Sequence, residues 1–131
     1  ISLSIQKGKK LHSSSEHNFD PPVGTLIRLS SNVATITAPN ASPMTFKGTQ
    51  TYLVGANDEV ALIDPGPEED SHFKAIKRSL DRKKLVGIFV THSHLDHSPL
   101  AKKISNEQKK LKKILSYLFK LILVTKLKKV E

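Results

Sequence analysis

The sequence predicts an α/β fold in which a mixed sheet carries flanking helices, and three observations point to it. Short segments rich in β-branched residues, with turn residues between them, fill the first half of the chain. A segment with helical periodicity follows, and a continuous apolar run comes directly after it. A helix that crosses over to a buried strand is a common way to extend such a sheet.

Four strands are expected before the first helix, in two pairs. TLIRLS (25–30) and NVATIT (32–37) form the first pair across a tight Ser-Asn turn. APNASPM (38–44) is a loop rich in Pro, Asn and Ser. QTYLV (50–54) and EVALID (59–64) form the second pair, with GAND between them as a hairpin connection of ordinary length.

A helix, a strand and a second helix are expected next. Apolar residues at helical spacing, preceded by the acidic turn PGPEED, predict a helix over roughly 68–82. The run LVGIFV (85–90) is short and β-branched, which favours a buried strand. Ser98 is a favourable N-cap and Pro99 suits a first helical turn, so a helix should begin there and run into the lysine-rich end.

Composition excludes several classes of protein. Because the chain has no cysteine, a disulfide framework, a cysteine-ligated zinc and a thiol nucleophile are all excluded. The N-terminus lacks the apolar segment of a signal peptide, and the longest apolar run near the end, LILV, is far too short to span a bilayer. We therefore expect a soluble, cytoplasmic protein without a transmembrane segment.

The net charge of +9 is unevenly distributed and divides the chain into segments. Residues 1–101 hold 11 Lys and Arg against 10 Asp and Glu, whereas residues 102–131 hold 10 Lys against two Glu. We expect a polar, serine-rich flexible arm (1–20), a partial α/β domain (21–104) and a helical tail rich in Lys, Leu and Ile (105–131).

Two interpretations of the basic tail stay open. Its apolar residues form a helical stripe with the lysines mostly off it: Leu111, Ile114, Leu115, Leu118 and Ile122. One interpretation is a small basic protein that binds RNA or an anionic surface through residues 108–131. The other, which we favour, is an out-of-frame or degraded end, because A·T-rich codons for Lys, Leu and Ile give the same bias.

The stretch THSHLDH (91–97) places three histidines and an aspartate close together. His92 and His94 are two apart, so in an extended segment both imidazoles can face one metal ion. Asp96 and His97 lie just past the turn and can face a second ion. Two adjacent ions can share a hydroxide that acts as a nucleophile near neutral pH. This spacing of ligand-type residues is rare by chance, and it predicts a metal site at the exit of a buried strand.

The motif resembles the signature of the metallo-β-lactamase-fold hydrolases, the family that includes glyoxalase II. FKGTQTYLVGANDEVALIDPG (46–66) is similar to the family's early strand pair, which ends in an Asp-x-Gly turn. ASPMTFKGTQTYLV resembles the subgroup called β-lactamase-like protein 2, whose animal members are implicated in RNA cleavage. The resemblance covers roughly residues 21–104 and implies the N-terminal half of an αββα sandwich.

The resemblance also implies roles for single residues. His92 and His94 would bind a first zinc ion and Asp96 and His97 a second, with Asp96 also the candidate catalytic residue. Asp64 would hold the ligand loop from behind through hydrogen bonds. The implied reaction is hydrolysis of a thioester, lactone, lactam or phosphodiester by a zinc-bound hydroxide. The implied partners are a small-molecule substrate of the ester or thioester type, or RNA.

Part of what such a site needs is missing from the sequence. A zinc site has at least three protein ligands in most proteins. The family supplies the further ligands downstream, yet no His or Asp follows His97 here. His72, at a helix start, is expected to be solvated rather than a ligand. We therefore expect a truncated hydrolase that needs its site completed; the alternative is a non-catalytic remnant.

The implied fold is incomplete as well. Family members pack two similar α/β halves, sheet against sheet, and this sequence has roughly the first half. One apolar face of the sheet would then be uncovered, and such faces favour association. A homodimer that covers this face is therefore expected as one partner.

Overall fold

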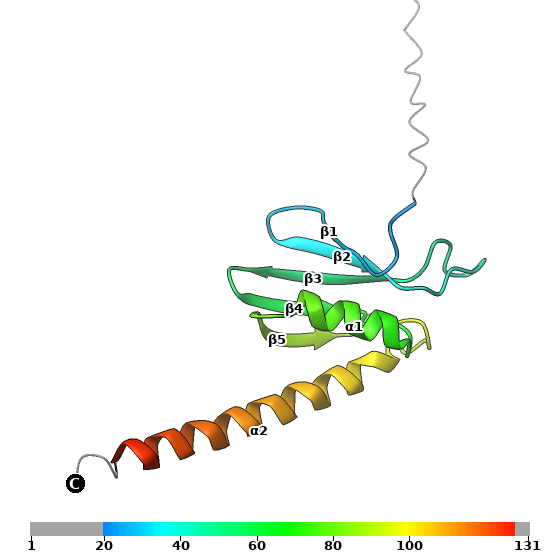
Figure 1. Ribbon diagram of the computed structural model, residues 1–131. Helices are drawn as coiled ribbons and strands as arrows, with labels where there is room; N and C mark the ends of the chain where they lie inside the picture. The colour runs from blue at the N-terminus through cyan, green and yellow to red at the C-terminus, as the bar shows by residue number, and fades with distance from the viewer. Residues whose placement is uncertain (1–19, 128–131) are drawn as a thin grey trace, which may run out of the picture.

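The computed structural model describes residues 20–127, with side chains described as far as Lys120. The predicted flexible arm lies almost wholly outside the described residues. Five strands and two helices follow in chain order (Figure 1): β1 (Leu26–Arg28), β2 (Val33–Thr37), β3 (Gln50–Ala56), β4 (Glu59–Ile63), α1 (Asp70–Ser79), β5 (Lys84–Phe89) and α2 (Pro99–Leu127). This is the α/β arrangement that the sequence predicts, with boundaries shifted by a few residues.

The five strands form one mixed sheet in the order β1-β2-β3-β4-β5. The first four pair antiparallel, and β5 lies parallel to β4 at the edge, because α1 crosses over between them. The hairpin between β3 and β4 is tighter than predicted, since Ala56 pairs with Glu59 and only two residues connect the strands. Asn57 accommodates this turn with φ of 55°, a conformation that Asn tolerates better than most residues.

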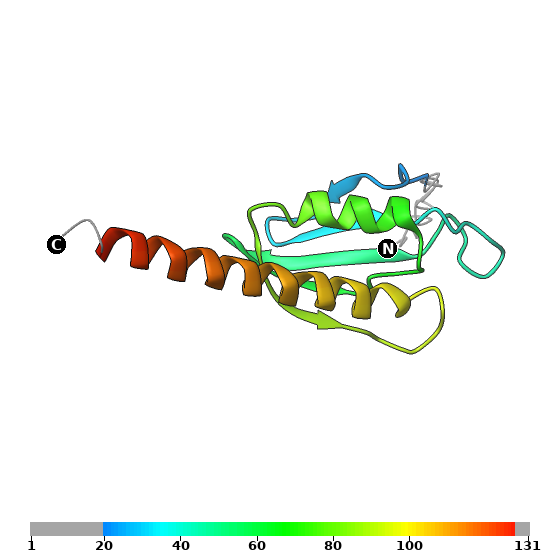
Figure 2. The same cartoon turned by 60° about the horizontal axis from the view of Figure 1, so that its bottom comes forward.

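Both helices lie on the same face of the sheet (Figures 1 and 2). Their apolar side chains and those of the strands beneath form a single buried core: Ile36, Leu53, Val60, Leu62, Ala75, Ile76, Leu80, Leu100 and Ile104. The alternation of strand side chains explains this arrangement, because every second residue of β2, β3 and β4 points to the helices. The domain is therefore a two-layer structure.

Among residues 20–127, no helix covers the opposite face of the sheet. Tyr52, Val54 and Ile63 are half-buried there, and β5 adds Phe89, which pairs with Ile63 and is 60% exposed. The apolar face predicted to be uncovered is thus present. The homodimer expected to cover it stays a prediction.

The prediction that 85–90 forms a buried strand is only half right. A strand forms, but it is the edge strand of the sheet and none of its residues is fully buried. The continuous apolar run arises because the helices cover one face of β5, through Leu85 and Ile88, while the other face is open. An apolar run alone does not distinguish a central strand from an edge strand.

The second helix extends well beyond the sheet. It begins at Pro99, as predicted, and its first turns pack on the sheet through Leu100 and Ile104, which are 0% and 2% exposed. The remainder projects past the edge of the domain (Figures 1 and 2). Neither of the described helices is both long enough and apolar enough to cross a membrane.

Candidate metal centre

The motif THSHLDH forms the loop between β5 and α2. The parallel strands β4 and β5 end at the same edge of the sheet, and a candidate site residue lies within three residues of the end of each. Asp64 follows Ile63, the last residue of β4, and Thr91 and His92 follow the end of β5. Because parallel strands bring their carboxyl ends together, two segments distant in sequence meet here.

A turn of three residues, Asp64-Pro65-Gly66, fastens this loop to the sheet. The amide of Gly66 donates to the carbonyl of His97 at 3.0 Å, and the carbonyl of Gly66 accepts from the amide of Leu100 at 3.3 Å. Asp64 and Gly66 both have positive φ, 47° and 90°. A Cβ on Gly66 would lie 2.9 Å from Nε2 of His72, so both the backbone conformation and the packing require glycine.

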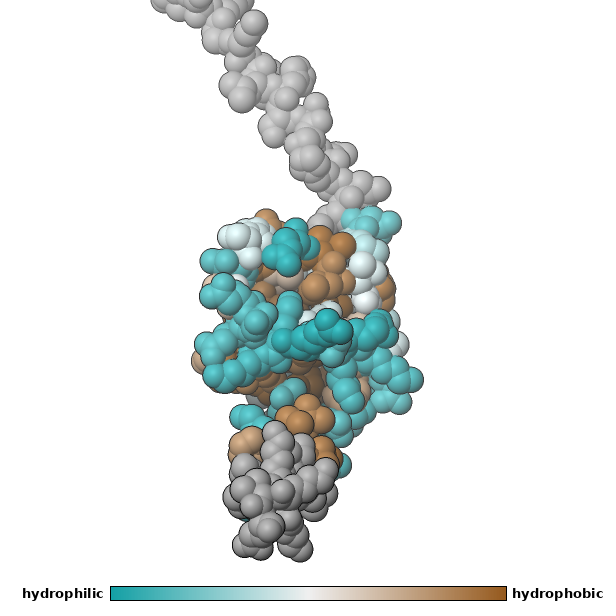
Figure 3. Space-filling view, turned by 60° about the vertical axis from the view of Figure 1, so that its left-hand side comes forward, coloured by the Kyte–Doolittle hydropathy of each residue, from teal (hydrophilic) through white to brown (hydrophobic). Residues whose placement is uncertain are grey.

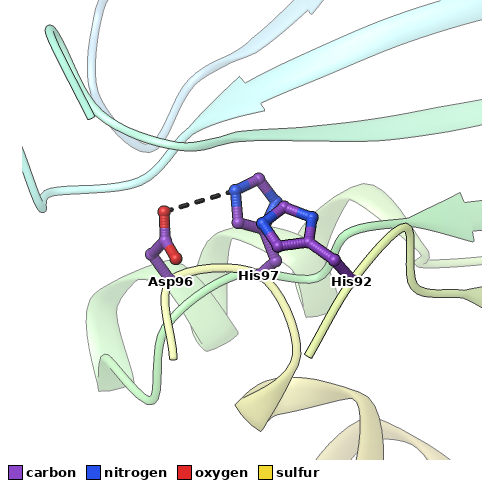
Figure 4. A group of neighbouring side chains, drawn as sticks. All are labelled: His92, Asp96 and His97. Atoms are coloured by element: carbon purple, nitrogen blue, oxygen red, sulfur yellow. Dashed lines mark ion pairs between the residues drawn. The ribbon is translucent and has the colours of Figure 1, made fainter. Parts of the chain in front are cut away.

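The structure brings together three of the four predicted ligands. His92, Asp96 and His97 each offer a ligand atom, and these atoms lie within 4.8 Å of one another (Figure 4). Nε2 of His97 lies 3.2 Å from Oδ2 of Asp96. The rings of His92 and His97 are adjacent, with centroids 4.0 Å apart. Two imidazoles and a carboxylate therefore converge on one small volume at the end of β5.

His94 lies beside this group without joining it. Its ring meets that of His92 edge to face, with centroids 4.6 Å apart, and its side chain is exposed. The segment from Thr91 to His97 is a loop with a turn, so residues two apart do not share a face as they would in a strand. The predicted assignment of His92 and His94 to one ion stays a prediction.

Asp64 lies behind the ligand loop and makes several hydrogen bonds. Its carboxylate accepts from the amide of Thr91 at 2.8 Å and from the hydroxyl of Thr91 at 2.7 Å, and Oδ2 lies 3.1 Å from Nδ1 of His97. Burial alone would raise the pKa of Asp64, but the hydrogen bonds from Thr91 and the contact with His97 outweigh it and lower the pKa below its ordinary value. Asp64 is therefore a carboxylate at neutral pH.

Asp64 also orients His92 through Thr91. The Thr91 hydroxyl lies 2.9 Å from Nδ1 of His92 as well as 2.7 Å from the Asp64 carboxylate. Since the carboxylate can only accept, the hydroxyl donates to it and accepts from Nδ1–H of His92. In a neutral imidazole this arrangement places the lone pair on Nε2 of His92, and such a lone pair is what binds a metal.

The donor set fits a zinc ion. Histidine and carboxylate are zinc ligands, and a carboxylate behind a ligating histidine is a common companion of such sites. Both ring nitrogens of His97 face carboxylates, Nδ1 toward Asp64 and Nε2 toward Asp96. If Nδ1 carries the proton, Nε2 presents a lone pair toward a carboxylate, and a cation between them would remove that repulsion.

The prediction that His72 is solvated is wrong. Its side chain is fully buried beneath the Asp64-Pro65-Gly66 turn, with 0% exposure. Its Nε2 lies 2.8 Å from the hydroxyl of Thr51, which donates to the carbonyl of Asp64 at 2.7 Å. Burial lowers the pKa of His72 to about 4, although the nearby carbonyl of Pro65 favours the charged form. His72 is thus a neutral structural residue that supports the turn.

Several residues around the site were not foreseen from the sequence. Thr49 donates to Oδ2 of Asp96 at 3.4 Å, and Asn40 bonds both the amide and the hydroxyl of Thr49 at 2.9 Å. Thr51 and Thr91 take part in the contacts described above. A hydroxyl residue in an otherwise apolar strand, such as Thr51 in QTYLV, is the one sequence feature that could have indicated a buried hydrogen bond. The sequence does not show which residue is its partner, because the fold decides that.

An open groove of about 750 Å³ lies in front of the candidate ligands. One wall is the loop between β2 and β3, with Asn40 and Met44, and the other is the ligand loop, with Leu95. Met44 and Leu95 are 94% and 83% exposed. The candidate ligands are therefore accessible from solvent, as a site that receives a substrate must be.

Comparison with known proteins agrees with this geometry. A family model described as the metallo-beta-lactamase superfamily matches residues 44–113, more than half of the chain. A β-lactamase-like protein 2 homolog of Drosophila melanogaster is 35% identical over 78 residues, which are 57% of this chain and 27% of the relative. The homolog in Caenorhabditis elegans is 34% identical over 96 residues, which are 71% of this chain and 32% of the relative.

Similarity of the same degree extends to fungal proteins. An atrochrysone carboxyl ACP thioesterase of Aspergillus chevalieri is 35% identical over 81 residues, 60% of this chain and 26% of the relative.

Among solved structures, a β-lactamase domain protein from Burkholderia ambifaria matches with a TM-score of 0.49 and 21% identity, over 64% of this chain and 28% of that one.

The matched residues include both halves of the site, the Asp64-Pro65-Gly66 turn and the ligand loop. The chain spans about a quarter to a third of the length of these curated relatives. The relatives are hydrolase-like proteins, a thioesterase among them. The match of the family model to residues 44–113 establishes that this chain belongs to the metallo-β-lactamase superfamily.

Proposed function

We propose that the chain forms part of a zinc-dependent hydrolase and supplies some of the ligands of its metal site. The observation that supports this most is the convergence of His92, Asp96 and His97, whose ligand atoms lie within 4.8 Å of one another. The contact between the Asp64 carboxylate and His97 supports it further. A carboxylate beside the far nitrogen of a ligating histidine favours the tautomer whose other nitrogen binds the metal, and it raises the basicity of that nitrogen.

In this proposal each residue has a defined role. His92 and His94 bind one ion, and Asp96 and His97 bind a second ion beside it. The exposed His94 ring adjoins that of His92, so a side-chain rotation can turn it toward a shared ion. Asp96 is the candidate catalytic residue because it is a carboxylate that faces the open groove.

The protein's own residues hold the ligands in position. Asp64 fixes His97 directly and His92 through the Thr91 hydroxyl, and Thr49 fixes the carboxylate of Asp96. Bound zinc would lower the pKa of a water molecule and polarise the carbonyl or phosphoryl group of a substrate. The substrate classes that we propose are a thioester, lactone, lactam or phosphodiester; the similarity to a thioesterase supports the first of these.

The remaining ligands come from outside the ligand loop. Residues 98–131 contain no His or Asp, so a complete pair of zinc sites needs groups from beyond these residues or from a second copy. The proposal for the 131-residue chain is accordingly zinc binding at the ligand loop, and catalysis is proposed for the completed site.

A zinc titration against a competing chelator tests the proposal. We expect sub-micromolar zinc binding by the unaltered chain, and its loss in the variant His92→Ala/His94→Ala. The variant Asp64→Asn should bind about 10–100-fold more weakly than the unaltered chain, because it loses the carboxylate that orients His97.

A matched control removes two histidines from elsewhere in the sequence. The variant His12→Ala/His17→Ala carries the same number of substitutions outside the ligand loop and should bind zinc as the unaltered chain does. If the His92→Ala/His94→Ala variant binds as tightly as this control, the ligand loop does not bind zinc and the proposal is wrong.

A further inference from the structure

The second helix has two parts with different surroundings. Its first part is fixed to the domain: Leu100 and Ile104 are buried, and ion pairs join it to α1 through Lys103 with Asp70 at 2.9 Å and Lys77 with Glu107 at 3.4 Å. The part from residue 108 to 120, which we call the projecting segment, extends past the sheet (Figures 1 and 2). The projecting segment is helical without a packed core beneath most of it.

An apolar stripe continues along the projecting segment on the face that is buried in the first part. Leu111, Ile114, Leu115 and Leu118 fall at spacings of three, one and three residues, which places them on one side of the helix. They are 56%, 55%, 58% and 49% exposed. Figure 3 shows brown side chains at this end of the molecule, next to the grey end of the chain. Four large aliphatic side chains in a row are therefore left in contact with solvent.

The charged side chains of the projecting segment are all positive. Five exposed lysines lie on it, away from the stripe: Lys109, Lys110, Lys112, Lys113 and Lys120. The sequence contains no acidic residue between Glu107 and Glu131. A helix with aliphatic residues on one side and lysines on the others has the composition of helices that lie at the interface of a membrane.

We propose that the projecting segment binds the surface of an anionic lipid membrane. Its apolar stripe would enter the boundary between headgroups and acyl chains, and its lysines would contact lipid phosphate and carboxylate groups. Because the segment projects from one end of the domain, it can enter the interface at an angle while the ligand loop, at the other end of α2, stays in solvent. This inference goes beyond the proposed hydrolase and does not depend on it.

Two other occupants fit the observations less well. Within residues 108–120, a second copy would pair two stripes of four half-exposed aliphatic side chains, each about two turns long. Such a contact offers less area than the roughly 1,200 Å² that stable interfaces bury. Pairing would also bring together lysine-rich flanks of the same sign. RNA would neutralise the lysines but leave the aliphatic stripe exposed, and only Tyr117 and Phe119 could stack on bases.

Co-sedimentation with lipid vesicles tests the proposal. We expect the 131-residue chain to bind vesicles of phosphatidylcholine with 30% phosphatidylserine at least about tenfold more tightly than pure phosphatidylcholine, with an affinity that falls as salt is raised. The variant Leu115→Ser/Leu118→Ser should lose most of this binding. The variant Lys112→Glu/Lys113→Glu should bind these vesicles about tenfold or more weakly, because each lysine near the membrane surface contributes to the attraction to anionic lipid.

Matched controls carry equal changes elsewhere on the surface. Leu29→Ser/Val86→Ser alters two side chains with 57% and 54% exposure, and Lys74→Glu/Arg78→Glu changes the net charge by the same amount on α1. Both controls should bind vesicles as the unaltered chain does. Equal losses in the controls and the projecting-segment variants would refute the proposal, because binding would then follow net charge or general hydrophobicity.

Two further measurements assign the occupant. Sedimentation without lipid should show that Leu115→Ser/Leu118→Ser leaves the oligomeric state of the chain unchanged. If the unaltered chain self-associates and this variant does not, a second copy covers the stripe and the proposal is wrong. Binding to a single-stranded RNA should be weaker than to the anionic vesicles at the same salt. Tighter RNA binding that survives Leu115→Ser/Leu118→Ser would assign RNA as the partner instead.

Discussion

The ligand loop and the layer directly beneath it differ sharply in burial. In the lower layer, Thr51 and His72 are fully buried and Asp64 is 6% exposed, and hydrogen bonds connect all three. In the loop above, His92 and His94 are exposed and Leu95 is 83% exposed. The residues that would meet a metal or substrate are therefore held by a layer that solvent does not reach.

This difference in burial indicates that the lower layer contributes mainly to stability and the loop mainly to binding. A buried polar group without a partner costs free energy, so the lower layer is tightly constrained by its hydrogen bonds and packing. An exposed loop residue has few such constraints and can move to bind a ligand. Changes in the lower layer should therefore destabilise the fold, whereas changes in the loop should alter binding alone.

The largest effect is expected for Gly66→Ala. A positive φ of 90° is unfavourable for alanine, and the new Cβ would lie 2.9 Å from a buried ring that cannot move away. The strain and the overpacking together should lower the free energy of unfolding by about 3 kcal/mol. Urea denaturation measures this change.

Substitutions at two other glycines separate the contribution of backbone strain from that of overpacking. Gly24 has φ of 69°, and the nearest atom to its Cβ would be at 4.0 Å, so Gly24→Ala tests the conformation alone and should cost about 1 kcal/mol. At Gly87 the atoms nearest to a new Cβ belong to the exposed ring of Phe89, which can move, so Gly87→Ala should cost less. If Gly66→Ala costs no more than Gly24→Ala, the turn is not tightly packed against His72.

The second prediction concerns pH. The pKa of His72 is about 4 in the folded protein against an ordinary value of 6.5, so the unfolded chain takes up the proton first as pH falls. Stability from neutral His72 is complete above pH 6.5 and is lost as pH falls toward 4. The loss from this group should reach roughly 2–3 kcal/mol at pH 4.5.

Comparison with His72→Gln isolates this contribution. Urea denaturation at pH 7.5 and 4.5 should show that the unaltered chain loses roughly 2–3 kcal/mol more than the variant, since effects of carboxylates cancel in the difference. Glutamine keeps a donor for the Thr51 hydroxyl and has no proton to gain in this range. Equal losses in the two proteins would mean that His72 is protonated, or exposed, in the folded state.

The smallest effect is expected in the loop itself. Leu95 is 83% exposed between the candidate ligands, so Leu95→Ala should change the free energy of unfolding by less than about 0.5 kcal/mol. The same urea denaturation measures it. A loss above 1 kcal/mol would show that Leu95 packs against another part of the chain in solution, and the contrast between loop and lower layer would be weaker than the structure indicates.

Local patterns in the sequence were sufficient to predict most of the elements. The alternation in 32–37 and 50–54 identified strands, and Pro99 marked the start of a helix, because these signals depend on neighbours along the chain. The four candidate ligands lie within one loop, so their spacing alone indicated a metal site. Asp64 was expected near this loop only through the resemblance to a known family.

The sequence was a poor guide wherever the environment depends on distant residues. His72 was expected in solvent because it begins a helix, yet the helix faces the sheet and places this ring over Thr51. The run 85–90 was expected inside the sheet, yet β5 is its edge. The contact of Thr49 with Asp96 joins residues 47 positions apart and has no local signal.

The sequence by itself therefore determined which residue types could bind a metal, where strands and helices form and where positive charge gathers. These properties follow from local periodicity and side-chain chemistry. The tertiary structure alone decided that Asp64 lies behind His97, that His72 is buried and neutral, and that α2 leaves the sheet after its first turns. Each of these depends on which surfaces face each other once the chain is packed, and no property of a single segment specifies that.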